Sequence, residues 1–225
     1  NDLDLDGSIT TGTGDLNLGA SDGGTLAMGD AVGDLTVDND ELSRINTQNL
    51  NFGSTEGSGD ILVDGVTADA SENIVNMNLD ATGDGNSVTF EGTESVFNTL
   101  DVQADDGIYV NTNITTDTGD LTLEGDADNI ADGNDAVNFA DGIRVESAND
   151  LNVDASTGGI NGAGELFLIA DNNVNVNDTV TVTTKDAPTV EMVREYFNSR
   201  GYVEEFADKF FYYYNSLDWL NTKNK

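Results

Sequence analysis

The sequence predicts an all-β protein, built as a parallel β-solenoid and followed by a short pair of α-helices. Three observations favour this fold class. A short unit of turn and strand recurs through the chain, helix signals are nearly absent from residues 1–184, and the composition changes abruptly near Lys185. We therefore expect two domains, a solenoid repeat domain over residues 1–184 and a linker with a two-helix module over residues 185–225.

The recurring unit is a Gly-Asp turn followed by an apolar, a polar and an apolar residue. The closest copies are residues 14–18, 33–37, 59–63 and 119–123, and looser copies are residues 106–110, 141–145 and 149–153. Alternation with a period of two is typical of a strand with one buried face. Gly and Asp tolerate tight backbone geometry, so each pair predicts the turn that opens the strand.

The spacing of these units predicts how the strands are joined. Successive copies begin roughly 20 to 30 residues apart, which suits a solenoid whose parallel strands stack turn on turn. Weaker strands, residues 88–90 and 100–102, lie between the copies. A β-sandwich or a barrel is the alternative. The short strands and scarce aromatic residues favour the solenoid, because a sandwich of this size needs more large core residues.

The C-terminal tail predicts two helices. The first begins after Pro188 with Thr189 as its N-cap, and it ends at Gly201, the residue that follows the C-cap. The second runs from about Val203 to Leu220. Its apolar stripe comprises Phe206, Phe210, Tyr213, Tyr214 and Leu217. Because two such helices cannot bury their aromatic faces alone, we expect them to dock on a third surface, which is the solenoid end, a partner chain or residues missing from this fragment.

Composition excludes several classes of function. The chain has 225 residues and a formal net charge of −35. Nucleic acid and anionic membrane surfaces are excluded as partners, since both would repel such a chain. Without Cys or His, a disulfide framework, a thiolate nucleophile, a Ser-His-Asp triad and a His-based zinc site are excluded. There is no signal peptide or apolar run of transmembrane length, and the chain opens within the repeat pattern, so we expect a fragment of a longer protein.

Three passages of the body carry a resemblance to a known family. They are residues 41–63, 87–123 and 151–182, and they include Leu50-Asn51-Phe52-Gly53-Ser54 and Thr115-Thr116-Asp117-Thr118-Gly119-Asp120-Leu121-Thr122-Leu123. Their order and sustained alternation resemble the filamentous-haemagglutinin-like repeats of large bacterial exoproteins, over nearly all of residues 3–184. The resemblance implies a right-handed parallel β-helix, secretion to the cell surface or the extracellular space, and adhesive or scaffold duty. It implies glycans or proteins of a host surface, or neighbouring copies, as partners, and it carries no catalytic residues.

The tail departs from that family. Residues 207–219 resemble a short helical segment of phage and phage-derived replication-type proteins. This second resemblance implies an alternative function, a phage or virion fibre segment whose helical tail anchors it to another virion protein.

An oxygen-rich stretch, residues 125–142, is the candidate metal site. Calcium prefers about six to eight hard oxygen ligands, which a dense set of carboxylates and amides supplies. The candidate ligands are Asp126, Asp128, Asp132, Asp135 and Asp141, with Asn129 and Asn134 between them. The spacing does not fit an EF-hand, and a solvated excursion from the solenoid is the alternative. A second acidic set comprises Asp80, Asp84, Asp105 and Asp106.

A β-helix enzyme that acts on polysaccharides, as a glycosidase or a lyase, is the third functional alternative, because paired carboxylates perform glycoside hydrolysis. Lyase chemistry also needs a basic residue, and the body contains only Arg44 and Arg144. Arg144 lies at an outward strand position between Ile143 and Val145, which predicts a surface ion pair with a neighbouring acid. We therefore expect a non-enzymatic protein.

Two further patterns predict contacts. Asparagines recur near strand ends, as Asn111, Asn113, Asn173, Asn175 and Asn177, which predicts rows of bonded side-chain amides on stacked turns. In the tail, Phe211, Tyr212 and Trp219 fall outside the apolar stripe and predict an exposed partner interface. The sequence thus predicts a structural or adhesive extracellular rod module, with calcium as its one candidate cofactor.

Overall fold

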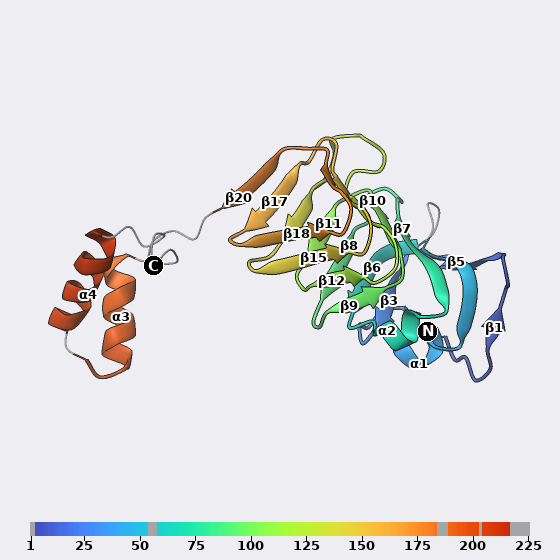
Figure 1. Cartoon of the computed structure of the whole chain (residues 1–225), viewed down its shortest axis with the longest axis horizontal. Coiled ribbons are helices and arrows are strands. Elements are labelled where there is room, and N and C mark those ends of the chain that lie inside the picture. The colour runs from blue at the N-terminus through green and yellow to red at the C-terminus, as the bar shows by residue number, and fades with distance from the viewer. Residues whose placement is uncertain (1–2, 54–57, 184–188, 203, 217–225) are drawn as a thin grey trace. The chain divides into compact units, whose positions relative to one another are not determined.

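The computed structural model describes residues 3–53, 58–183, 189–202 and 204–216. The chain divides into two compact units, Asn1–Thr183 and Thr184–Lys225. The first unit consists mostly of parallel strands with two short helices, and the second contains a pair of helices (Figure 1). Among the helices described, none has the length and apolar character needed to cross a membrane.

The strands of the first unit form three parallel sheets. The first sheet comprises β1 (Ile9–Thr10), β2 (Asp15–Leu18), β5 (Ile45–Gly53), β7 (Ile74–Ala81), β10 (Leu100–Ala104), β13 (Leu121–Glu124), β16 (Leu151–Asp154) and β19 (Val174–Val176). The second comprises β3 (Gly24–Gly29), β4 (Leu35–Val37), β6 (Ser58–Asp64), β8 (Val88–Glu91), β11 (Ile108–Val110), β14 (Val137–Phe139), β17 (Ile160–Ala163) and β20 (Val180–Thr183). The third comprises β9 (Ser95–Phe97), β12 (Ile114–Thr116), β15 (Ile143–Ser147) and β18 (Leu166–Ala170).

From β7 onward the chain visits the three sheets in a fixed cyclic order. It passes from β7 through β8 and β9 and returns to the first sheet at β10, and the same order continues to β20. We call one such passage a coil. Each returning strand pairs in parallel with the strand of the preceding coil, as β10 does with β7. The predicted all-β class with stacked parallel strands is confirmed at this level, and the arrangement is compatible with a solenoid.

In-register stacking builds the core of the first unit. Leu100 lies opposite Leu121 in the neighbouring strand, and Leu121 lies opposite Leu151. All three side chains are buried. The residue that follows each leucine in its strand, Asp101, Thr122 or Asn152, is only half-buried. Burial of one alternating row per sheet is what the period of two predicts. The core is thus a set of apolar ladders that run from coil to coil.

Two one-turn helices, α1 (Asn39–Leu42) and α2 (Ala68–Ser71), precede β7 in the chain and were not predicted. A capping box forms α1, because Asp38 accepts from the Glu41 N–H and the Glu41 carboxylate accepts from the Asp38 N–H. Helix α1 contacts α2, and α2 contacts β9. The two helices therefore continue the line of the third sheet toward the N-terminus.

The second unit contains α3 (Val190–Ser199) and α4 (Glu204–Ser216). The Thr189 hydroxyl accepts from the Met192 N–H at 3.3 Å, which confirms the predicted N-cap. Helix α3 ends in a Schellman motif, with Gly201 in the left-handed conformation at φ 78° and the Tyr202 N–H donating to the Phe197 carbonyl. The predicted end of the second helix at Leu220 lies outside the described residues.

Candidate binding surfaces

The predicted metal-binding stretch is divided by a strand. Residues 137–139 form β14, because Val137 and Phe139 alternate inward around Asn138. The expectation of one continuous loop over residues 125–142 is therefore wrong. Asp141 lies beyond β14, where its carboxylate accepts from the Glu165 N–H at 2.9 Å.

Three of the remaining candidate ligands, Asp126, Asp128 and Asp135, accept hydrogen bonds from backbone N–H groups. Asp126 is fully buried and accepts from the Thr157 N–H at 2.7 Å through Oδ2, while its Oδ1 has no partner in the described structure. Asp135 is buried and accepts from the Gly133 N–H and the Thr157 hydroxyl. Asp128 accepts from the Ile130 N–H at 2.7 Å.

The turns that follow β7, β10 and β13 form one corner of the stacked coils, and this corner brings together acids from both predicted sets. Burial, followed by the charge of nearby carboxylates that include Asp128 and Asp84, raises the pKa of Asp105 above its usual range. Loss of hydration, followed by the charges of Asp128 and Asp105, raises the pKa of Asp132. Asp80 instead binds locally and accepts from the Thr82 hydroxyl at 2.6 Å. Within the described ranges, no three acidic side chains are placed to hold one metal ion.

Aspartates at the coil corners share a structural role that the motif alone does not reveal. Asp120 accepts from the Asp150 N–H at 3.1 Å and from the Asn149 amide at 2.6 Å, both in the next coil. The same bridge to a backbone N–H of a neighbouring coil is made by Asp60, Asp64, Asp105, Asp126, Asp141 and Asp150. These carboxylates satisfy N–H groups that a turn leaves without a ladder partner. These seven aspartates are therefore intercoil acceptors.

The outward face of the first sheet carries a continuous polar row. In-register partners place one residue of each strand side by side, in the order Asn17, Asn51, Asn78, Asp101, Thr122, Asn152 and Asn175. Amide bonds join Asn51 to Asn17, Asn78 to Asn51 and Asn175 to Asn152 at 2.7 to 2.9 Å. The predicted amide row is confirmed for Asn175. It extends far beyond the asparagines that the sequence singled out.

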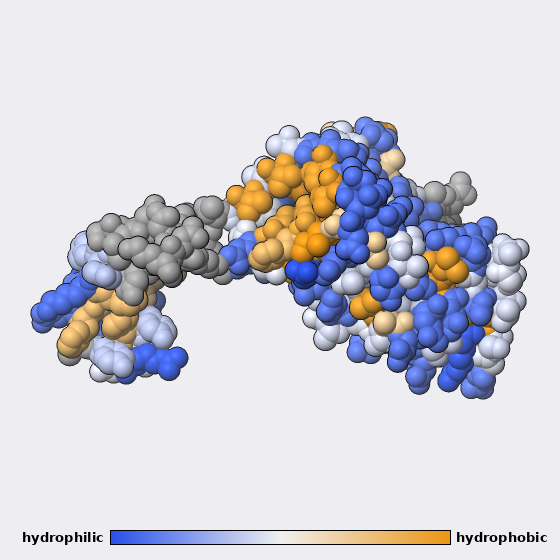
Figure 2. Space-filling view, viewed as in Figure 1, coloured by the Kyte–Doolittle hydropathy of each residue, from blue (hydrophilic) through white to orange (hydrophobic). Residues whose placement is uncertain are grey.

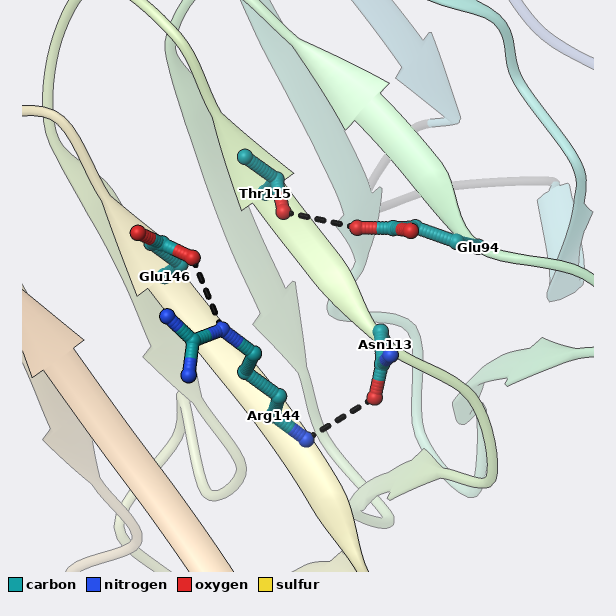
Figure 3. A network of polar contacts seen from close by, with 5 residues as sticks. All are labelled: Glu94, Asn113, Thr115, Arg144 and Glu146. Carbon is teal, nitrogen blue, oxygen red and sulfur yellow. Dashed lines mark hydrogen bonds and ion pairs between the residues drawn. The ribbon is translucent and has the colours of Figure 1, made fainter.

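Figure 3 shows the surroundings of Arg144 on the outward face of the third sheet. Its Nε donates to Glu146 at 2.8 Å, and its backbone N–H donates to the Asn113 side chain at 2.9 Å. Nearby, the Thr115 hydroxyl donates to Glu94 at 2.9 Å. The predicted surface pairing of Arg144 with an acid is confirmed. In the early coils, Arg44 donates to the Leu5 carbonyl at 2.6 Å.

The helical pair forms an aromatic groove of about 460 Å³. It is lined by Phe197, Tyr202, Phe206, Lys209, Phe210 and Tyr213. Phe206 and Tyr213, which belong to the predicted apolar stripe, are 58% and 60% exposed. The part of the stripe whose side chains are described, Phe206, Phe210 and Tyr213, is therefore exposed within the helical pair. Leu217 lies outside the described residues.

The residues predicted for the partner interface have different environments. Tyr212 is exposed, and Phe211 is half-buried with its ring 5.4 Å from that of Tyr212. Trp219 lies outside the described residues. Within the pair, Arg194 of α3 binds Asp208 of α4 through two bonds of 2.6 and 3.0 Å, and this pairing lowers the pKa of Asp208.

Comparison of the chain with protein-family models, with curated proteins and with solved structures finds no match. The resemblances drawn from the sequence therefore stay predictions.

Proposed function

We propose that the first unit is a right-handed parallel β-helix that serves as a structural or adhesive module of a large secreted or surface-exposed protein. The observation that supports this proposal best is the uninterrupted register of the first sheet. One polar row and one apolar ladder continue through its strands from β2 to β19. Such a stack holds its two ends a fixed distance apart, which is how a scaffold protein positions the surfaces that it carries.

The use of the polar side chains also supports a scaffold. Amides of the outward row bind one another, and corner aspartates bind backbone N–H groups of the next coil. A catalytic pair of carboxylates must instead keep its oxygens available to substrate. The proposal accordingly assigns the acidic residues to stacking and solubility, and the outward faces to contact with glycans or proteins at a surface.

A second candidate function is a virion fibre segment with a helical anchor. The observation that favours it is the exposed aromatic groove between α3 and α4, since large uncovered apolar surfaces mark interfaces. The complete gene discriminates between the two candidates. Further repeats of the Gly-Asp unit after residue 225 support the adhesin module, whereas neighbouring genes for virion proteins support the fibre.

Glycan binding tests the proposed adhesive role. The full chain is applied to a glycan array, and soluble polysaccharides are incubated with it while new reducing ends are measured. We expect binding to a restricted set of glycans without release of reducing ends. Release of reducing ends that exceeds the level with heat-unfolded protein would contradict the proposal and favour the enzyme.

A further inference from the structure

The two ends of the strand unit differ in how their apolar ladders are covered. At the N-terminal end, Leu3 and Leu5 pack on the core. Leu3 donates its N–H to the Thr36 carbonyl, and the Leu5 N–H binds the Glu41 carboxylate at 3.1 Å. Asp4, which lies between these two leucines, is exposed. This end therefore has a cap with a charged outer side, which stacked repeats need for solubility.

The C-terminal end has ladder positions that are uncovered. Val174 and Val180 are 44% and 42% exposed, whereas their in-register partners in the preceding coil, Leu151 and Ile160, are fully buried. Val182 is 43% exposed. Figure 2 shows the result as a concentration of apolar surface over the last strands, around β17, β18 and β20.

Among the described residues, the last strand of each sheet also has an unpaired edge, and that strand carries no charge. β18, β19 and β20 are the terminal strands of their sheets, with the sequences LFLIA, VNV and VTVT. None contains a charged residue or a proline, the usual means of blocking an edge. At the other end of the first sheet, β2 begins with Asp15. The N-terminal edge strands β1 and β4, with the sequences IT and LTV, also lack charge, but Leu3 pairs with Thr36 of β4 and packs on the core together with Leu5. Among the described residues, no comparable segment covers the C-terminal end.

The hydrogen-bond pattern of β20 shows which groups face the open edge. The Thr179 and Thr183 carbonyls accept from the N–H groups of Ile160 and Gly164, on the side of β17. Because successive residues of a strand direct their backbone groups to opposite sides, those of Val180 and Val182 face away from β17. Apolar side chains and unpaired backbone groups thus occur at the same two positions.

We propose that the C-terminal end of the strand unit is a dimer interface, at which two copies of the chain meet end to end about a twofold axis. The same end of a second copy supplies both strand backbone groups and apolar ladder residues, whereas a helix that covers an edge pairs its interior backbone groups within itself and supplies only side chains there. The capped, charged N-terminal end prevents head-to-tail growth, so association closes at two copies. Glu165, Asp171 and Asp178 flank the last strands, so salt strengthens the dimer by screening their repulsion.

Substitutions at two adjacent residues of β20 test this interface in the full chain. Val182→Lys places a charge on the open end, and Val182→Pro removes an N–H that faces away from β17, so both leave the pairing with β17 in place. Thr181→Lys puts the same charge on the outward face of the same strand and serves as the control. Circular dichroism and thermal melts verify that every variant is folded.

Sedimentation equilibrium at about 0.05 M and about 0.5 M NaCl gives the readout. We expect the wild type and Thr181→Lys to reach twice the chain mass of 23.7 kDa, more completely at high salt. Both Val182 variants should dimerise at least about tenfold more weakly. A wild-type chain that is monomeric at every concentration and salt, as expected if another part of the same chain covers this end, would overturn the proposal. Dimers that persist in both Val182 variants would overturn it as well.

Discussion

At the scale of single residues, the corner aspartates replace the ladder hydrogen bonds that the backbone loses where it turns. Asp120 opens one of the recurring units, and its carboxylate binds the Asp150 N–H of the next coil. The Gly-Asp pair thus has two roles, since it permits the turn and joins that turn to its neighbour. Asp150 repeats the arrangement with the Asn173 N–H at 3.0 Å.

Replacing Asp120 tests this role. Asp120→Ala leaves the Asp150 N–H without its acceptor, and we expect the free energy of unfolding in urea to fall by about 1–2 kcal/mol. Asp120→Asn retains an acceptor oxygen and should cost less than half as much. Equal losses in the two variants would mean that the charge of the carboxylate, rather than its acceptor oxygen, stabilises the corner.

Glu124 illustrates a cost of the acidic composition. It lies opposite Gln103 in one neighbouring strand and opposite Asp154 in the other. Burial, followed by the charges of Asp154 and Asp126, raises its pKa above the usual range, although a bond from the Asp126 N–H opposes the shift. A carboxyl whose pKa is raised by folding destabilises the protein at neutral pH, and the penalty disappears as the pH falls through the folded-state pKa.

We therefore expect Glu124→Gln to raise the free energy of unfolding at pH 7 by up to about 1 kcal/mol, the scale of like-charge pairs across strands. The gain should shrink as the pH falls through the raised pKa of Glu124. Gln103→Glu is the matched control, because it adds an acid beside Asp80 and Glu124 and should destabilise at pH 7. A Glu124→Gln variant that is less stable than wild type at pH 7 would contradict the assignment.

At the scale of elements, the strands were predictable because alternation is a local property. The units at residues 14–18, 59–63 and 119–123 all contain strands, and the inward positions of β6 and β13 are buried. Contacts between corners were not predictable, because Asp120 and Asp150 are joined by stacking over a separation of 30 residues. The one-turn helix α1 was missed because its signal is a single capping box.

The candidate sites were predictable only in part for the same reason. The composition located the acidic stretch over residues 125–142. The alternation Val137-Asn138-Phe139 inside it forms β14, which separates Asp141 from the other candidate ligands. Asp105 joined the corner through stacking of separate coils, which residue order does not reveal. For the helical pair, Phe206, Phe210 and Tyr213 of the predicted stripe line one groove, whereas Tyr214 and Leu217 stay predictions.

Core substitution measures how strongly the strands depend on stacking. Leu123 in β13 is fully buried between Val102 and Val153 of the adjoining strands, so Leu123→Ala should cost about 2–5 kcal/mol in unfolding free energy. Val75→Ala, at a 46% exposed position of β7 in the same sheet, should change stability by no more than about 0.5 kcal/mol. Comparable losses in the two variants would contradict the assignment of inward and outward faces.

At the scale of the whole molecule, calcium dependence distinguishes a metal-stabilised fold from one stabilised by stacking alone. Because the corner carboxylates already accept from backbone N–H groups, we expect coincident thermal melts with calcium and with chelator. The contrary result is a higher Tm with calcium that Asp126→Asn abolishes. It would establish the metal site that the sequence suggests and assign the unpaired Asp126 oxygen to it.

The stacked register is the central claim, and distances between spin labels test it most directly. The chain has no cysteine, so paired Cys substitutions carry the only labels. One label replaces Asn175 and the second replaces Asn78, Asn51 or Asn17, which lie successively further along the polar row. Strand spacing predicts backbone separations of about 19, 24 and 29 Å, an increase of about 4.8 Å for each strand. Separations that do not rise by this constant step would contradict the stacked parallel register and the scaffold function argued from it.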